Sequence, residues 1–145
     1  MSGRVERLEM SPRVLAAWGP VVLWGALIFV FSTSAFSAVN TARFIDPILA
    51  WLFPGISNPS IDLGHTLIRK LAHFTEYAIL FWLLVRGPLA GRPAAAMLIC
   101  VSYALLDEFH QVFVMGRTAS IYDVVLDSSG AMFSGFLRAA LSEIV

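Results

Sequence analysis

Seven ionisable side chains interrupt stretches of this sequence that are otherwise apolar enough to enter a membrane. They comprise five of the ten acidic residues and two of the three histidines: His73, Glu76, Asp107, Glu108, His110, Asp123 and Asp127. An ionisable group costs roughly 2.5–3.5 kcal/mol at the centre of a membrane helix, so such groups normally face a protected interior. Their concentration in three segments predicts a polar site enclosed by helices.

The composition fits a protein that crosses a membrane several times. The chain has 145 residues, of which 58% are hydrophobic and 14% charged, and its mean hydropathy of +0.76 exceeds that of an ordinary soluble domain. We predict one domain, 1–145, with spans at approximately 14–31, 71–85, 94–115 and 121–141. The first span is long and uncharged, and we interpret it as a retained helix rather than a cleaved signal peptide.

The long loop after the first span contains a further amphipathic segment. Residues 40–53 predict a short helix lying in the membrane interface, with Asn40 as its N-cap. Ser60 is predicted to cap the next helix, and His65, outside the span, is expected to be solvated. The predicted fold is therefore all-α: an integral membrane four-helix bundle with a short interfacial helix in the first outer loop.

Basic residues near the span ends predict that both termini lie in the cytoplasm. One side of the membrane would carry six basic residues: Arg4, Arg7, Arg13, Arg86, Arg92 and Arg138. The other side would carry four: Arg43, Arg69, Lys70 and Arg117. With this orientation, the seven ionisable residues share the outer leaflet, beneath a rim formed by Arg69, Lys70 and Arg117.

Helical spacing groups these residues on shared faces. His65, Arg69, His73 and Glu76 follow one stripe, and Asp107, His110 and Gln111 follow another. Catalysis by proton transfer would use Glu76, Glu108, His110, His73, Asp107 and Asp123. Substrate binding would use Arg69, Lys70, Gln111 and Arg117. The spacing leaves open which of Asp107 and Glu108 faces the pocket.

Two other interpretations account for the same side chains. A divalent metal is one, since pairs of ligands three residues apart hold metals in helical bundles; its candidates are His73, Glu76, Asp107, His110, Asp123 and Asp127. This spacing is weakly specific, and no cysteine or close histidine pair supports it, so the cofactor stays unassigned. The other interpretation is a structural network in which the charges neutralise one another and fix the helix register.

Three motifs resemble those of the VanZ-like family of bacterial membrane proteins. They are Lys70-x-x-His73-Phe74-x-Glu76-Tyr77, then Asp107-Glu108-x-His110-Gln111-x-Phe113, and finally Gly116-Arg117 followed by Asp123 and Gly130. Asp127 departs from the family pattern, in which an asparagine is expected. The resemblance implies a multipass protein of the bacterial cytoplasmic (inner) membrane. The family is named for a member associated with teicoplanin resistance, and the resemblance implies no particular reaction.

We therefore expect an outer-leaflet polar pocket that binds or acts on an anionic envelope lipid or a lipid-linked cell-wall precursor, with a link to glycopeptide (teicoplanin) resistance implied by the family. The alternative is a non-enzymatic membrane scaffold or partner-binding protein whose charge network is structural. In that case the small residues from Gly130 to Gly135 would contact a partner or a second copy. Zero net charge gives no reason to expect a nucleic-acid partner. The sequence leaves open whether the protein is an enzyme.

Overall fold

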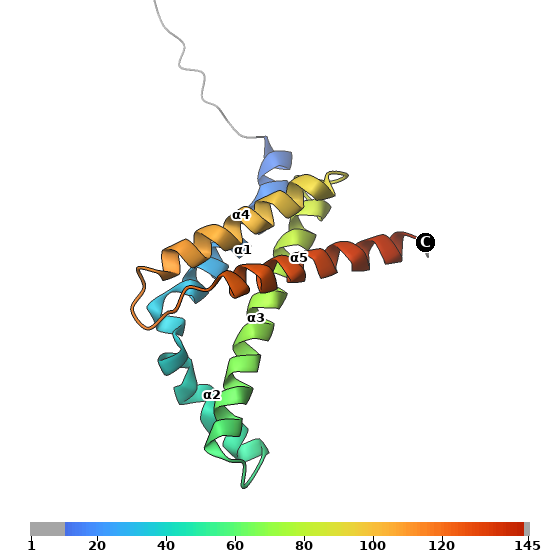
Figure 1. Cartoon of the computed structure of the whole chain (residues 1–145). Helices are drawn as coiled ribbons and strands as arrows, with labels where there is room; N and C mark the ends of the chain where they lie inside the picture. Colours follow the sequence, from blue (N-terminus) through green and yellow to red (C-terminus); the bar gives the residue numbers. More distant parts are fainter. Residues whose placement is uncertain (1–10, 144–145) are drawn as a thin grey trace, which may run out of the picture.

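The computed structural model describes residues 11–143, which form five α-helices and one short 3₁₀ helix (Figure 1). This part of the chain contains no strand, which confirms the predicted all-α class. In chain order the elements are α1 (Pro12–Ser32), η1 (Ser34–Phe36), α2 (Ala38–Leu52), α3 (Asn58–Arg86), α4 (Pro93–Gln111) and α5 (Ile121–Ser142). Arg4 and Arg7, used to predict the orientation, lie outside the described residues.

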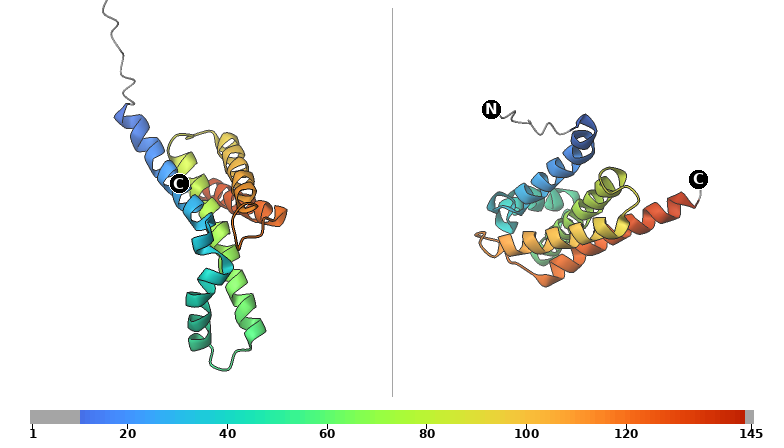
Figure 2. Two further views of the ribbon diagram at one scale, coloured as in Figure 1. Left: turned by 90° about the vertical axis from the view of Figure 1, so that its left-hand side faces the viewer. Right: turned by 90° about the horizontal axis from the view of Figure 1, so that it is seen from above.

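The central element is α3, which contacts every other α-helix. Its first half forms a hairpin with α2 that projects from the rest of the molecule (Figure 2). Its second half packs against α1, α4 and α5. The arrangement follows from the sequence of α3, whose polar first half and apolar second half suit different surroundings.

In both helices of the hairpin the N-cap lies three residues before the predicted one. Ser37 and Ser57 occupy the N-cap positions, so the assignments of Asn40 and Ser60 were wrong. Pro59 lies in the first turn of α3, where its missing N–H costs nothing, and this favours the earlier start. Asn40 lies inside α2 and donates a hydrogen bond from Nδ2 to the carbonyl oxygen of Ser34 (2.9 Å).

The second half of α3 crosses α5 steeply, and small residues allow the close approach (Figure 1). A Cβ atom on Gly130 would overlap the carbonyl oxygen of Phe74. Ala131 and Ser134 are also buried on this face of α5. The prediction that these small residues let helices approach closely is confirmed, and the contact is made within one chain.

Apolar side chains from four helices form the core beside this crossing. It is built from Ile28 of α1, Ala96, Cys100 and Ala104 of α4, Ala131 of α5, and Tyr77, Leu80, Phe81, Leu84 and Val85 of α3. Small residues on α4 face large residues on α3, which lets the two helices interlock. This core fixes the second half of α3 and therefore the side chains that precede it.

Within residues 11–143, one helix, α1, is long and apolar enough by length and composition to cross a membrane. The other predicted spans carry the carboxylates and histidines already described, which lower their hydropathy. The four-span bundle therefore stays a prediction. Within the predicted span 94–115, α4 ends at Gln111, and the chain then turns to Gly116, whose φ of +77° favours glycine.

Candidate functional site

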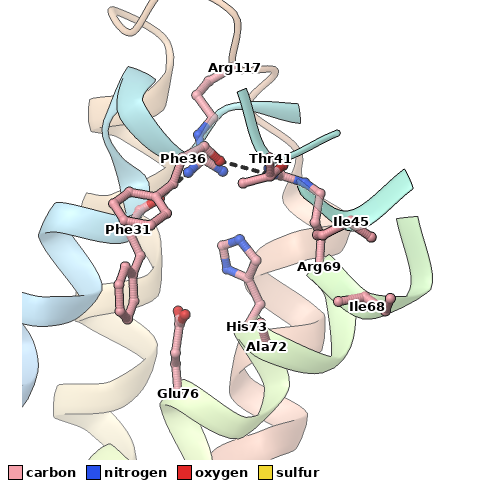
Figure 3. A pocket seen from close by; sticks show the side chains of 10 residues that line it. All are labelled: Phe31, Phe36, Thr41, Ile45, Ile68, Arg69, Ala72, His73, Glu76 and Arg117. Carbon is pink, nitrogen blue, oxygen red and sulfur yellow. Dashed lines mark hydrogen bonds between the residues drawn. The ribbon is translucent and has the colours of Figure 1, made fainter. Parts of the chain in front are cut away.

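Two neighbouring cavities lie where the hairpin meets α1 and the α4–α5 loop. The first, here called the arginine pocket, has a volume of about 230 Å³ and is lined by Phe31, Phe36, Thr41, Ile45, Ile68, Arg69, Ala72, His73, Glu76 and Arg117 (Figure 3). The second, here called the side cavity, has a volume of about 210 Å³ and shares Arg69, His73 and Arg117 with the first. The remaining lining residues of the side cavity include Lys70, Gln111 and Asp123.

Two half-buried guanidinium groups are held at the arginine pocket by neutral oxygens. Arg69 donates from Nη1 to the carbonyl oxygen of Phe36 (2.7 Å) and to Oγ1 of Thr41 (3.2 Å). Arg117 donates to the carbonyl oxygens of Phe31 and Thr33. No carboxylate within residues 11–143 forms an ion pair with either arginine. The backbone therefore positions two positive charges without neutralising them.

Arg69 and Arg117 lie outside the predicted spans, and their surroundings act on their protonation in opposing ways. Burial lowers the pKa of Arg69 from its ordinary value, while the nearby charges of Asp123 and Glu76 act to raise it. Burial also lowers the pKa of Arg117, and repulsion from Arg69 adds to this effect. Arginine starts from such a high pKa that both groups stay cationic at neutral pH. The pocket therefore has two close positive charges, and an anion would relieve their mutual repulsion.

His73 and Glu76 project from α3 into the same pocket (Figure 3). Nδ1 of His73 lies 3.5 Å from Oδ1 of Asp127, which is fully buried on α5. The two residues flank the crossing at Phe74 and Gly130, so close packing there brings them together. The imidazole thus has a buried carboxylate on one side and the pocket on the other.

Two predicted binding residues are engaged by acidic neighbours. Lys70 donates from Nζ to Oδ1 of Asp123 at 2.5 Å, across α3 and α5. Gln111 donates from Nε2 to Oδ2 of Asp107 (3.0 Å), and both side chains are buried. Of the three predicted rim cations, Lys70 is thus neutralised, whereas the two arginines keep their charge available.

Glu108 and His110 do not line the arginine pocket. Oε2 of Glu108 accepts a hydrogen bond from the backbone N–H of Ser120 (2.6 Å), at the start of α5. Nδ1 of His110 lies 3.4 Å from Oγ of Ser32, and its ring packs against Phe29. These two side chains tie α4 to α5 and to α1. Asp107, next to Glu108, instead accepts the hydrogen bond from Gln111, which lines the side cavity.

His65 is buried and does not lie in solvent as expected. Its Nε2 lies 2.9 Å from Oγ1 of Thr41, and its Nδ1 lies 3.8 Å from Oδ1 of Asp46. These contacts join α3 to α2 and hold Thr41 beside Arg69. His65 therefore helps to position Thr41 at the arginine pocket, and it lines the side cavity itself.

The metal candidates do not gather at one point. Within residues 11–143, no three histidine, cysteine, aspartate or glutamate side chains are grouped as a metal ion would require. His73 pairs with Asp127, Asp123 with Lys70, and Asp107 with Gln111. We propose no metal at this site.

Sequence reasoning missed the part of the pocket contributed by the end of α1, η1 and α2. Phe31, Phe36, Thr41 and Ile45 line the wall opposite α3. The amphipathic pattern of residues 40–53 predicted an interfacial helix, but it did not indicate that this helix would pack against α3. The carbonyl partners of Arg117 carry no sequence signal, because every residue has a carbonyl group.

Residues 11–143 form a helical protein with an apolar exterior, one helix long and apolar enough to cross a membrane, and a pocket that contains two arginines. A family model described as VanZ/LLP1 matches residues 17–141. This match covers most of the chain, which therefore belongs to the VanZ-like family. Family membership and the apolar α1 together suggest a membrane protein. No curated protein and no solved structure matches the chain.

Proposed function

We propose that the arginine pocket binds the anionic head group of an envelope lipid or lipid-linked cell-wall precursor in the outer leaflet of the bacterial cytoplasmic membrane. The observation that carries this proposal is the pair of guanidinium groups held by neutral carbonyl oxygens. Guanidinium groups bind phosphate and carboxylate oxygens through charge-assisted hydrogen bonds. Because the backbone fixes Arg69 and Arg117 in advance, little side-chain ordering would remain to oppose binding.

The distribution of side chains supports a position within the bilayer. Large apolar residues are exposed along α4 and α5, including Leu98, Leu105, Leu106, Phe109, Ile121, Val125, Met132, Phe133 and Phe136. Asp107, Glu108, Gln111 and Asp127 are buried. Apolar groups outside and charged groups inside are expected when hydrocarbon surrounds a protein. We propose that the chain crosses the membrane several times with both termini in the cytoplasm.

The position of α2 supports a pocket at the level of lipid head groups. Phe44, Ile48 and Trp51 are exposed on α2, as expected for a helix lying in the interface. Thr41 and Ile45 of the same helix line the arginine pocket. An interfacial α2 would thus place the two arginines where lipid phosphates lie.

His73 and Glu76 provide the groups for a catalytic form of this proposal. A proton on Nδ1 of His73 would be held by Asp127, which leaves Nε2 free to act as a general base in the pocket. Glu76 faces the same space from one turn further along α3. Assaying turnover of the bound lipid would identify the class of reaction. A link to teicoplanin resistance is a further form of the proposal, tested by the sensitivity of cells lacking the protein.

The structural alternative applies to a different subset of the charges. Glu108 holds the start of α5, and Lys70 pairs with Asp123 on the outside of the crossing. These contacts favour a scaffold role for Glu108, Lys70 and Asp123. Each contact connects two elements, and none of the three residues lines the arginine pocket. Assembly of copies through residues 130–135 stays a prediction, since Gly130, Ala131 and Ser134 are already buried within the chain.

Lipid titration followed by native mass spectrometry tests the proposal. Protein in mild detergent would be titrated with phosphatidylglycerol and with phosphatidylcholine. Arg69→Gln should weaken phosphatidylglycerol binding about tenfold or more, because a hydrogen bond to a charged group contributes about 1.5–3 kcal/mol. Arg92→Gln, in the exposed turn before α4, is the charge-matched control. Equal affinities for both lipids in every variant would refute the proposal.

A further inference from the structure

An open groove lies beside the arginine pocket, along the outside of α3. It has a volume of about 360 Å³ and is lined by Trp24, Ile68, Leu71, Ala72, Thr75, Glu76 and Ile79. Here it is called the α1–α3 groove. Ile68, Ala72 and Glu76 also line the arginine pocket, and Figure 3 shows them at its lower edge. The groove and the pocket therefore lie side by side along this stripe of α3.

The walls of the groove are suited to hydrocarbon. Trp24 donates from Nε1 to the carbonyl oxygen of Glu76 (2.8 Å), and Thr75 donates from Oγ1 to the carbonyl oxygen of Leu71 (2.7 Å). Both polar groups are thus satisfied within the protein and do not require a polar ligand. Ile68, Leu71, Ala72 and Ile79 supply the apolar part of the remaining lining. Glu76 is the charged residue of this lining, on the stripe of α3 that the groove shares with the arginine pocket.

The length of the groove matches one lipid leaflet. Ile68 and Ile79 are eleven positions apart on α3, which corresponds to about 16 Å of helix. Half of a hydrocarbon core about 30 Å thick is about 15 Å. In the proposed orientation, Arg69 lies toward the outer surface and Ile79 toward the middle of the bilayer. A tail in the groove would therefore run in the direction of the surrounding lipid chains.

We infer that the α1–α3 groove holds one hydrocarbon tail of the lipid whose head group occupies the arginine pocket. This inference rests on the proposed function and restricts the class of ligand that the site would bind. The ligand is an anionic amphiphile that contributes both a head group and a chain, and a soluble anion would fill only half of the site. Trp24 would contact the chain directly.

Quenching of Trp24 fluorescence by brominated lipids tests this inference. Trp18, Trp51 and Trp82 would be replaced by phenylalanine, which leaves Trp24 as the single tryptophan. The protein would be placed in phosphatidylcholine vesicles containing a small, equal fraction of chain-brominated phosphatidylglycerol or chain-brominated phosphatidylcholine. We expect stronger quenching by the phosphatidylglycerol, and loss of the difference in Arg69→Gln. Equal quenching by the two lipids would show that bulk lipid fills the groove and would overturn the inference.

The two proposals can fail separately. If phosphatidylglycerol binds in an Arg69-dependent manner by mass spectrometry but quenches Trp24 no better than phosphatidylcholine, the head-group site stands and the tail site is wrong. If binding does not depend on Arg69, the proposed function itself fails.

A second variant covers the case in which the single-tryptophan protein does not fold. Ile79→Trp would fill the distal end of the groove and should weaken long-chain phosphatidylglycerol binding at least several-fold, with little effect on dihexanoyl phosphatidylglycerol. Leu98→Trp, on the exposed face of α4, is the matched control and should change neither affinity. An equal effect of Ile79→Trp on both chain lengths would contradict the inference.

Discussion

Gly130 sets the distance between α3 and α5, so a single methyl group there should separate the two helices. A Cβ atom at this position would overlap the carbonyl oxygen of Phe74 and lie 2.9 Å from its carbonyl carbon and 3.1 Å from its Cα. All three atoms belong to the backbone, and no change of rotamer can move them. Gly130→Ala must therefore displace one helix against the other.

Two opposing contributions determine how much Gly130→Ala changes the free energy of unfolding. Inserting a methyl group into a packed interior costs about 1–3 kcal/mol, and the rigid neighbours here place Gly130→Ala at the upper end. Replacing glycine by alanine within a helix contributes about 1 kcal/mol in the favourable direction. The expected net loss is about 2 kcal/mol in the free energy of unfolding. The displacement would also lengthen the contact between His73 and Asp127.

Two other glycines provide a graded comparison. A Cβ atom on Gly25 would make ordinary contact with Tyr103, at 3.7 Å, so Gly25→Ala should be neutral or stabilising by up to about 1 kcal/mol. A Cβ atom on Gly135 would meet the ring of Phe81 at 3.3 Å. That ring is buried in the core, so the cost of displacing it by a few tenths of an ångström should offset the helix gain of about 1 kcal/mol, and the net effect should be close to zero. Stability would be measured by unfolding in mixed detergent and SDS micelles, followed by circular dichroism. The reasoning is refuted if Gly130→Ala is as stable as Gly25→Ala.

Three further substitutions test contacts at the ends of α5 and α4. Glu108→Ala should lower the free energy of unfolding by about 1–3 kcal/mol, because it leaves the N–H of Ser120 without its acceptor. Hydrogen exchange should then accelerate at the start of α5, and unchanged exchange there would argue against this role of Glu108. Asp123→Asn should cost less than about 1 kcal/mol, because Lys70 is half exposed and partly exposed ion pairs contribute little; a larger loss in chemical unfolding would contradict this estimate. Gly116→Ala should lower the free energy of unfolding by about 1–2 kcal/mol, because an L-residue is strained at a φ of +77°. An unchanged unfolding midpoint would contradict this expected strain.

The helical architecture was largely predictable because hydrophobic periodicity and turn residues mark it directly. The polar turn before Pro93 and the break at Gly116 separate α3, α4 and α5 as expected. The start of α3 was less predictable, because Ser57 and Ser60 offer similar caps. Their hydroxyl oxygens lie 2.9 Å apart, and the choice depends on where Pro59 fits.

The candidate site was only partly predictable. Spacing on α3 placed Arg69, His73 and Glu76 on one face, and the structure places all three in the arginine pocket. Spacing alone could not distinguish Asp107 from Glu108, because the partner of Glu108 is a backbone N–H in the following loop. The position of Thr41 in the pocket could not be predicted either, because it depends on how α2 folds back onto α3.

The most direct test of the central claim is to identify the lipids that co-purify with the protein. Lipids would be extracted from the wild type, from an Arg69→Gln/Arg117→Gln double variant, and from an Arg86→Gln/Arg92→Gln double variant with the same change of charge at exposed positions. We expect an excess of anionic over zwitterionic lipid with the wild type and the control, and loss of that excess when the two pocket arginines are replaced. The same lipid composition in all three preparations would contradict the assignment of the arginine pocket as a head-group site.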